Sequence, residues 1–321
     1  MSALANTTTS LVSIGNREDL EDVIYRVAPE ETPFTNNVGT VKCTGVFHEW
    51  QTESLASASG TNAALEGDDS PALGAPNLTT RVGNYNQIVR KVGGVSRTEE
   101  IVKKAGRVSE LNRQKTLKGL EAKRDLEMSL LGNYASNVES GGTPRHLGGF
   151  LSWLTSNVSR GTGGSSGGFS GGVTSTATAG TNRTLTESLV KTVLSSIFNN
   201  AGKAINGWQA YMSASDKQVF SGFTGIASIR KDVPGDEMAT IIGAADVYVS
   251  DFGNLALIPH PYGVSNQVII VHPEMAAVGT LDGWKSVPLA QTGDAERFMI
   301  IGEKTLVMKN EKAHGVVADV T

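Results

Sequence analysis

The sequence predicts an α+β fold in which helices and strands occupy separate stretches of the chain. Helix-like spacing of apolar residues gathers at 97–131 and 184–202, whereas strand-like runs occur at 41–50, at 85–95 and again after residue 246. Segregation of this kind, rather than alternation, is typical of α+β proteins. The 321 residues allow one large or two smaller folding units, with enough buried apolar surface to fold without covalent staples.

The composition excludes several classes of protein. Hydrophobic residues make up 39% and charged residues 19%, which is too apolar for wholesale disorder. Cys43 is the only cysteine, so an intrachain disulfide and a multi-cysteine metal site are excluded. The net charge of −4 argues against a strongly basic nucleic-acid binder. No apolar run approaches the ~18 residues of a membrane span, and no secretory signal is present, so we expect a soluble chain in a reducing cytoplasm.

The first 95 residues predict two segments that extend from the body. Residues 1–40 begin polar and threonine-rich and carry one amphipathic patch, from Leu20 to Val27, so we interpret them as an arm. The runs at 41–50 and 85–95 flank a long stretch of small and polar residues and predict an extended hairpin. A loop of that length is unusual inside a compact domain, so we expect its contacts to lie on another chain.

Residues 97–131 predict one long helix. Apolar residues from Ile101 to Leu131 keep helical spacing, with Gly119 as the weakest point, and at 1.5 Å per residue the helix would span ~50 Å. Nine basic and six acidic residues alternate along it. We interpret these charges as a solvated face above an apolar stripe and not as catalytic groups.

The rest of the chain predicts a mobile loop followed by a second set of helices and strands. Residues 160–182 are rich in glycine and serine, and we expect them to bury no core and to stay mobile. Thr184 and Glu187 predict a capping box at the start of a helix. The apolar face of that helix comprises Leu185, Leu189, Val190, Val193, Leu194 and Ile197. A short helix is expected at 213–220, a hairpin at 247–258, and strands at 268–271 and 297–309.

No enzyme, cofactor or metal site emerges from the motifs. The pattern Gly-x-Ser-x-Gly occurs twice between Gly163 and Gly172, but without the strand and helix that a nucleophile elbow requires. The five histidines lack metal-ligand spacing. Glu66, Asp68 and Asp69 lack the spacing of a calcium loop, so we interpret them as a solvated or partner-facing cluster. We therefore expect neither catalysis nor a cofactor.

Eight blocks of sequence, in order from about residue 18 to the C-terminus, carry a family resemblance. The longest reads Asp-Val-Ile-Tyr-Arg-Val-Ala-Pro-Glu-Glu-Thr-Pro-Phe. The blocks lie at 22–34, 47–52, 66–69, 81–87, 123–127, 217–223, 246–253 and 310–313. Together they resemble the major capsid proteins of tailed bacteriophages, in a subfamily formerly described only as a domain of unknown function.

The resemblance implies a Hong Kong 97-type capsid fold and a division of the chain into segments. These are an N-terminal arm, an extended loop, a peripheral domain with a long spine helix, an axial domain, and a C-terminal return to the peripheral domain. In that order, the expected segments are 1–40, 41–95, 96–148, 149–285 (which includes the glycine-rich loop 160–182) and 286–321.

The function that the resemblance implies is that of a major capsid protein. Such a subunit self-assembles as hexamers and pentamers, in the host cytoplasm, into the icosahedral head that encloses double-stranded DNA in the virion. The expected partners are further copies of the chain, a separate scaffolding protein, a cement or decoration protein, the portal and non-specifically held DNA, with no membrane. Two alternatives stay open: a nanocompartment (encapsulin-like) shell protein of the same fold, and a soluble hydrolase or binding module.

The resemblance also implies an inter-subunit contact, because the family's extended loop lies over a neighbour's peripheral domain. Residues 49–81 carry five acids and one base, whereas residues 97–131 carry three more bases than acids, so we expect attraction between them. The acids are Glu49, Glu53, Glu66, Asp68 and Asp69, and the bases considered are Lys103, Lys104, Arg107, Arg113 and Lys115. The namesake of the fold cross-links a loop lysine to a neighbour's asparagine. No lysine occurs between Cys43 and Arg90, so we expect no such bond here.

Overall fold

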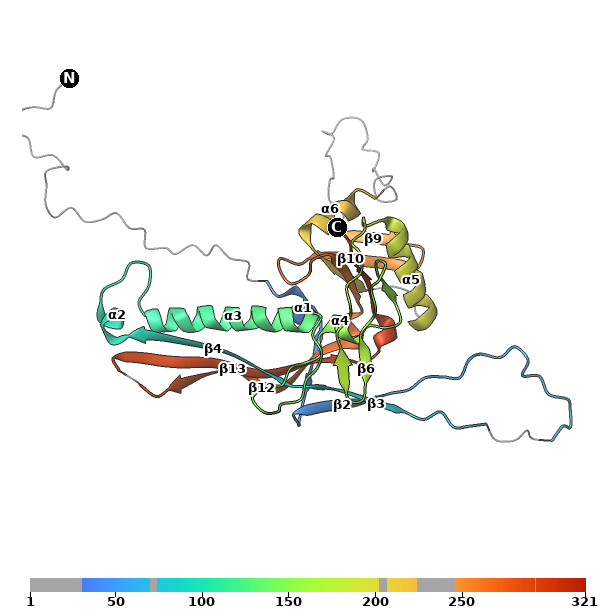
Figure 1. The fold of residues 1–321 in the computed structure, drawn as a ribbon, viewed down its shortest axis with the longest axis horizontal. Coiled ribbons are helices and arrows are strands. Elements are labelled where there is room, and N and C mark those ends of the chain that lie inside the picture. Colours follow the sequence, from blue (N-terminus) through green and yellow to red (C-terminus); the bar gives the residue numbers. More distant parts are fainter. Residues whose placement is uncertain (1–30, 70–73, 202–206, 224–245, 292) are drawn as a thin grey trace, which may run out of the picture.

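The molecule is elongated, with one group of long elements and one compact group (Figure 1). The computed structural model describes residues 31–69, 74–201, 207–223, 246–291 and 293–321. Figure 1 shows the helix α3 (Glu110–Leu131) lying alongside long strands, the helices α5 (Glu187–Ala201) and α6 (Ala214–Ser221) in the compact group, and a loop that extends away from both. The patch at Leu20 to Val27 lies outside the described residues.

The long group is a four-stranded sheet covered by α3. Its strand order is β1 (Gly39–Lys42), β12 (Ala276–Leu289), β13 (Ala295–Met308) and β4 (Gln87–Ser96), with β1 parallel to β12 and the other pairs antiparallel. α3 lies against β4 and β13. Leu126 and Leu130 are four residues apart, so both lie on the buried inner face of α3. They share a core with Phe298 of β13. The strand expected at 297–309 is confirmed, and β12 is an addition that the sequence analysis missed.

The prediction of one helix over 97–131 is wrong. The structure has a short helix α2 (Arg97–Ile101), an irregular connection, and then α3. Ser109 ends the connection by accepting a hydrogen bond from the backbone N–H of Asn112, which makes it the N-cap of α3. Within the connection Gly106 has a φ of +71°, which an uninterrupted helix does not allow. The 22 residues of α3 span about 33 Å.

The compact group is a six-stranded sheet with helices on one face. Its strand order is β5 (Val158–Ser159), β14 (Gly315–Ala318), β11 (Gln267–Val271), β8 (Trp208–Met212), β10 (Gly253–Pro259) and β9 (Val247–Ser250). α5 and α6 pack on the face that carries Trp208 and Tyr248, whereas Tyr211 and Ile269 on the opposite face join the core of the long group. The expected hairpin at 247–258, strand at 268–271 and short helix at 213–220 are confirmed.

The helix α5 buries the face that its sequence predicts but begins later than expected. Val190, Val193, Leu194 and Ile197 are buried against the sheet. The backbone N–H groups of Leu189 and Val190 donate to the carbonyl oxygen of Thr186, so the helix begins at Glu187. The capping box assigned to Thr184 and Glu187 is therefore wrong.

The glycine-rich segment is folded, which contradicts the expectation of a loop that buries nothing. It contains a two-stranded ribbon of β6 (Gly168–Ser170) and β7 (Val173–Ser175), and Phe169 stacks on the ring of Trp153 with centroids 5.2 Å apart. Thr174 is buried and its hydroxyl accepts from the N–H of Ser136 at 2.8 Å. A Cβ atom at Gly161 would overlap the carbonyl oxygen of Thr181. The glycines permit close approach of two backbones here.

Short elements connect the two groups. α1 (Pro33–Asn37) precedes β1, α4 (Phe150–Trp153) lies between α3 and the glycine-rich ribbon, and β11 leads through η1 (Pro273–Met275) into β12. β13 continues through η2 (Glu311–Ala313) into β14, so a single stretch of chain passes from the first sheet into the second. Both oxygens of the Glu311 carboxylate are used by the backbone and hydroxyl groups of Thr155 and Ser156.

Replacing Gly161 with alanine tests the folding of the glycine-rich segment. Because the added methyl group overlaps the backbone at Thr181, we expect the free energy of unfolding to fall by about 1–3 kcal/mol. Gly39→Ala is the matched control, since a Cβ atom there meets nothing within 4 Å. Denaturant unfolding of the unassembled chain measures both. Equal stability of the two variants would show that 160–182 is not packed as described.

The burial of His314 indicates that the folded protein loses stability in acid. Burial lowers the pKa of His314 to about 3, although its hydrogen bond to the carbonyl of Met275 opposes the shift. Since the native pKa lies below the ordinary value of about 6.5, the unfolded chain binds a proton that the folded chain excludes as the pH falls below about 6.5. His314→Gln should remove up to about 1.4 kcal/mol per pH unit from the slope of stability against pH between those limits. Parallel curves for wild type and variant would contradict this.

Candidate functional site

The extended hairpin has a fixed base. β2 (Phe47–Thr52) pairs with β3 (Thr80–Tyr85) in antiparallel register from Phe47 opposite Tyr85 to Thr52 opposite Thr80, so an extended hairpin is present. Its strands differ from the predicted runs at 41–50 and 85–95, because β1 pairs with β12 and β4 pairs with β13 in the four-stranded sheet. Asn84 is buried, and its amide donates to the carbonyl oxygens of Gly148 and Leu306 at 3.0 and 2.9 Å. The indole N–H of Trp50 donates to the carbonyl oxygen of Met308 at 2.9 Å. These bonds fix the direction in which the loop leaves the body.

The tip of the hairpin is exposed throughout its described part. Every described residue of 53–79 is exposed, including three large apolar side chains. Leu55 is 90%, Leu65 81% and Leu78 80% exposed. Three nearly fully exposed leucines on one protrusion favour a surface that another chain covers. The sequence analysis considered only the charges of this loop and missed these leucines, although their presence in a stretch expected to protrude was the available signal.

The structure separates the five predicted acids into two groups. Glu49 forms an ion pair with Arg81 across its own hairpin, so it is already used within the chain. Glu53, Glu66, Asp68 and Asp69 lie on the tip, and within the described residues no ion pair involves them. These four acids, together with the three leucines, define what we call the tip surface.

The predicted bases are mostly engaged within the chain. Arg107 pairs with Glu99 and Glu110, and Arg113 pairs with Glu110 at 2.9 Å. A hydrogen bond from Gln114, with help from these two arginines, lowers the pKa of Glu110 against the opposing effect of burial.

Two further predicted bases also have partners in the chain, and one is exposed. The ammonium of Lys104 donates to two carbonyl oxygens beside α2, and that of Lys115 lies 5.8 Å from the ring centroid of Phe298. Lys103 is exposed.

The connection between α2 and α3 is the second exposed apolar surface. Ile101 is 72%, Val102 53% and Val108 99% exposed, and Lys103 lies among them. We call residues 101–108 the connection surface. Figure 1 shows this surface beside α2 at one extremity of the molecule and the hairpin loop at the other. The two surfaces therefore cannot meet within one chain.

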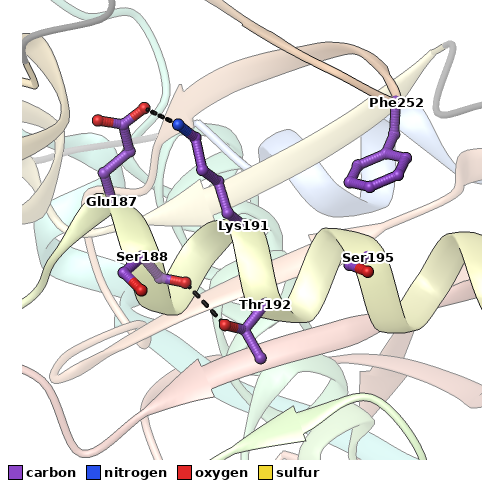
Figure 2. Close-up of a pocket in the computed structure, with 6 residues that line it drawn as sticks. All are labelled: Glu187, Ser188, Lys191, Thr192, Ser195 and Phe252. Atoms are coloured by element: carbon purple, nitrogen blue, oxygen red, sulfur yellow. Dashed lines mark hydrogen bonds and ion pairs between the residues drawn. The ribbon is translucent and has the colours of Figure 1, made fainter.

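The pocket over α5 holds no cluster of side chains arranged for catalysis. It is a shallow hollow over the outer face of α5, lined by Glu187, Lys191, Phe252 and three hydroxyl-bearing residues, as Figure 2 shows. Glu187 is paired with Lys191 at 2.9 Å, and this contact lowers the pKa of the carboxyl group. Within the described ranges, no cluster of three or more histidine, cysteine or acidic side chains suits a metal ion. In the same part of the chain, no helix is long and apolar enough to cross a membrane.

Comparison with known proteins identifies the family. The family model of the SU10 major capsid protein matches residues 4–321, nearly the whole chain. The chain belongs to the SU10 major capsid protein family. The major capsid protein of Escherichia phage Phieco32 is 37% identical over 121 residues, a match that spans 38% of this chain and only 34% of that protein.

Solved structures support the same fold over the full length. The capsid subunit of cyanophage A-1(L) superposes with a TM-score of 0.66 at 12% identity, covering 99% of this chain and 100% of the other. The capsid of a native GTA particle gives a TM-score of 0.63 at 9% identity with the same coverage. The expected Hong Kong 97-type fold and the role of major capsid protein are confirmed. Where one expected domain ends and the next begins stays a prediction.

Proposed function

We propose that copies of this capsid protein join head to tail, with the tip surface of one copy against the connection surface of the next. The observation that carries the proposal is that each surface exposes three large aliphatic side chains and that they lie at opposite extremities of the molecule. Contacts between two different surfaces close into rings when the rotation between neighbours is right. Rings of six and five copies would then form the hexamers and pentamers of an icosahedral head.

Apolar burial supplies most of the affinity in this proposal. Burying one leucine side chain contributes about 1.5–3 kcal/mol, whereas an exposed ion pair contributes about 0–1 kcal/mol. The tip acids, facing the exposed Lys103, guide the approach and set the register. Their effect is screened over about 8 Å at physiological ionic strength, so it depends on salt where the leucines do not.

The proposal also covers the other molecules that the shell binds. We propose that the shell assembles in the host cytoplasm around a separate scaffolding protein, incorporates a portal, accepts a cement or decoration protein, and holds double-stranded DNA by non-specific contact. We also propose that the chain has no enzymatic activity. Nuclease-protected DNA inside purified particles would support the proposal, whereas protein cargo without DNA would contradict it.

Variants of the tip surface separate its two components. Replacing Leu55, Leu65 and Leu78 with serine should abolish shell formation at every salt concentration, because the apolar burial is lost. Replacing Glu66, Asp68 and Asp69 with lysine should reduce shell yield strongly at low salt and less at high salt. Sedimentation and electron microscopy of particles measure the yield.

The control for these variants reverses exposed acids away from the tip. Asp251 and Glu274 are exposed, and within the described residues no ion pair involves them, so changing both to lysine should leave shell yield close to wild type. Wild-type yield from the leucine variant, or equal loss of yield from the control, would contradict the proposal.

The shell should contain no covalent links of the kind made by the namesake of the fold. The tip lacks lysine, and Arg81 cannot replace it because a guanidinium stays protonated and is a poor nucleophile. Particles boiled in detergent should give a single band near the 33.7 kDa of the chain on a denaturing gel. Ladders of boil-resistant pentamers and hexamers would refute this expectation.

A further inference from the structure

A buried carboxylate holds the segment from which the N-terminal arm departs. We call residues 31–38 the arm root. The side chains of Glu127, on α3, and His260, after β10, are both 0% exposed. The Oε1 atom of Glu127 accepts from the backbone N–H of Phe34 at 2.7 Å, and Oε2 accepts from the N–H of Thr35 at 2.9 Å and from the Thr35 hydroxyl. Three donors from the arm root thus converge on one carboxylate.

Glu127 replaces a helix cap that the arm root lacks. The first N–H groups of any helix have no partner within the helix and need one from outside. Thr32, at the N-cap position of α1, makes no capping hydrogen bond with its side chain. Phe34 is fully buried, with its ring edge-to-face against Phe150 and Tyr211. Its N–H group would be buried without a partner if Glu127 were absent or turned away, which is costly.

His260 holds Glu127 and the arm root together. The Nδ1 atom of His260 accepts from the backbone N–H of Tyr262 at 3.3 Å, so the ring proton is on Nε2. Nε2 lies 3.2 Å from Oε1 of Glu127 and donates to it. The hydroxyl of Tyr262 donates to the carbonyl oxygen of Glu31 at 2.7 Å. One imidazole therefore supports two ties to the arm root, through Glu127 and through Tyr262.

The other ionisable groups around the pair are two tyrosines and one arginine. They are Tyr211 on β8, Tyr262, and Arg124 on α3, whose guanidinium lies 5.0 Å from the Tyr262 ring centroid. Burial, and then the charge of Glu127, raises the pKa of Tyr262 to about 12 and raises that of Tyr211 as well. α1 carries no charged residue, and Glu31 is exposed. Among the described groups that face the pair, only Glu127 carries a carboxyl group and only His260 an imidazole.

We propose that Glu127 and His260 form a proton-operated latch on the arm root, closed near neutral pH and opened by acid. A proton added at Nδ1 of His260 removes the acceptor used by the N–H of Tyr262. A proton added to Glu127 turns one of its oxygens into a donor, which then faces donors from the arm root and His260. The first event weakens the tie from Tyr262 to Glu31, and the second weakens the tie from Glu127 to Phe34 and Thr35, so each loosens the arm root. The latch concerns how the arm is held and does not depend on the head-to-tail contact.

Hydrogen–deuterium exchange of the full-length, unassembled chain tests the latch. Protection factors, corrected for the intrinsic pH dependence of exchange, are compared at about pH 7.5 and about pH 5, the range in which histidine ordinarily changes charge. We expect protection of the amides of Phe34 and Thr35 to fall about tenfold or more in acid, while amides in the paired part of β13 stay protected. Unchanged protection of the arm root at the two pH values would overturn the proposal.

Two variants and a control identify the groups responsible. In Glu127→Gln, which presents a donor in place of one acceptor, the arm root should be weakly protected at both pH values. His260→Gln keeps an amide donor within reach of Glu127 but does not titrate, so it should reduce the pH response. Glu110→Gln is the control, because Glu110 is a buried, ion-paired carboxylate on the same helix that does not contact the arm root.

The control should respond to pH as the wild type does. If Glu127→Gln does not fold, the comparison of wild type at the two pH values still tests the latch, and His260→Gln tests the part assigned to the imidazole. A full wild-type response in His260→Gln would overturn the part assigned to His260, and a wild-type response in Glu127→Gln would overturn the part assigned to Glu127.

Discussion

The pairing of β13 on both edges is the interaction on which the rest of the structure depends. This strand is hydrogen-bonded to β12 on one side and to β4 on the other, and α3 packs against it. The chain then continues through η2 into β14, which lies between β5 and β11 in the compact sheet. Because this stretch of chain contributes β13 to one sheet and β14 to the other, the two groups of elements are joined by a short covalent connection as well as by shared apolar packing.

The pairing of β4 with β13 explains why the apolar side chains of the tip surface and the connection surface stay exposed in a single copy. β4 runs from the base of the extended hairpin to α2, so it carries the two extensions away from each other. The leucines of the tip surface and the aliphatic residues of the connection surface cannot fold back on one another without breaking β4 away from β13. A flexible chain would bury these apolar side chains internally. The rigid sheet prevents this, so only a neighbouring copy can cover them. The proposed head-to-tail contact rests on that geometry, and Glu127 on the inner side of α3 separately holds the arm root.

Sequence reasoning succeeded where one periodic signal decides the structure. The apolar face of α5, the hairpin β9–β10 and the strand β13 follow from local spacing, and the structure confirms them. The single helix over 97–131 failed because Gly106 and Ser109 carry the stop and start signals within a run that keeps helical spacing. The glycine-rich segment failed for another reason. Its order comes from close backbone approach, as between Gly161 and Thr181, and composition cannot reveal such a contact. The convergence on Glu127 joins residues more than ninety positions apart, which no local pattern encodes.

A cryo-electron microscopy reconstruction of the assembled particle tests the central claim most directly. We predict that Leu55, Leu65 and Leu78 of one subunit lie within about 4 Å of side chains of the connection surface of an adjacent subunit, around every ring. We also predict that the tip acids lie within reach of Lys103 on that neighbour. A map in which the tip stays in solvent, or in which the connection surface of each subunit is covered by something other than the tip, would contradict the account.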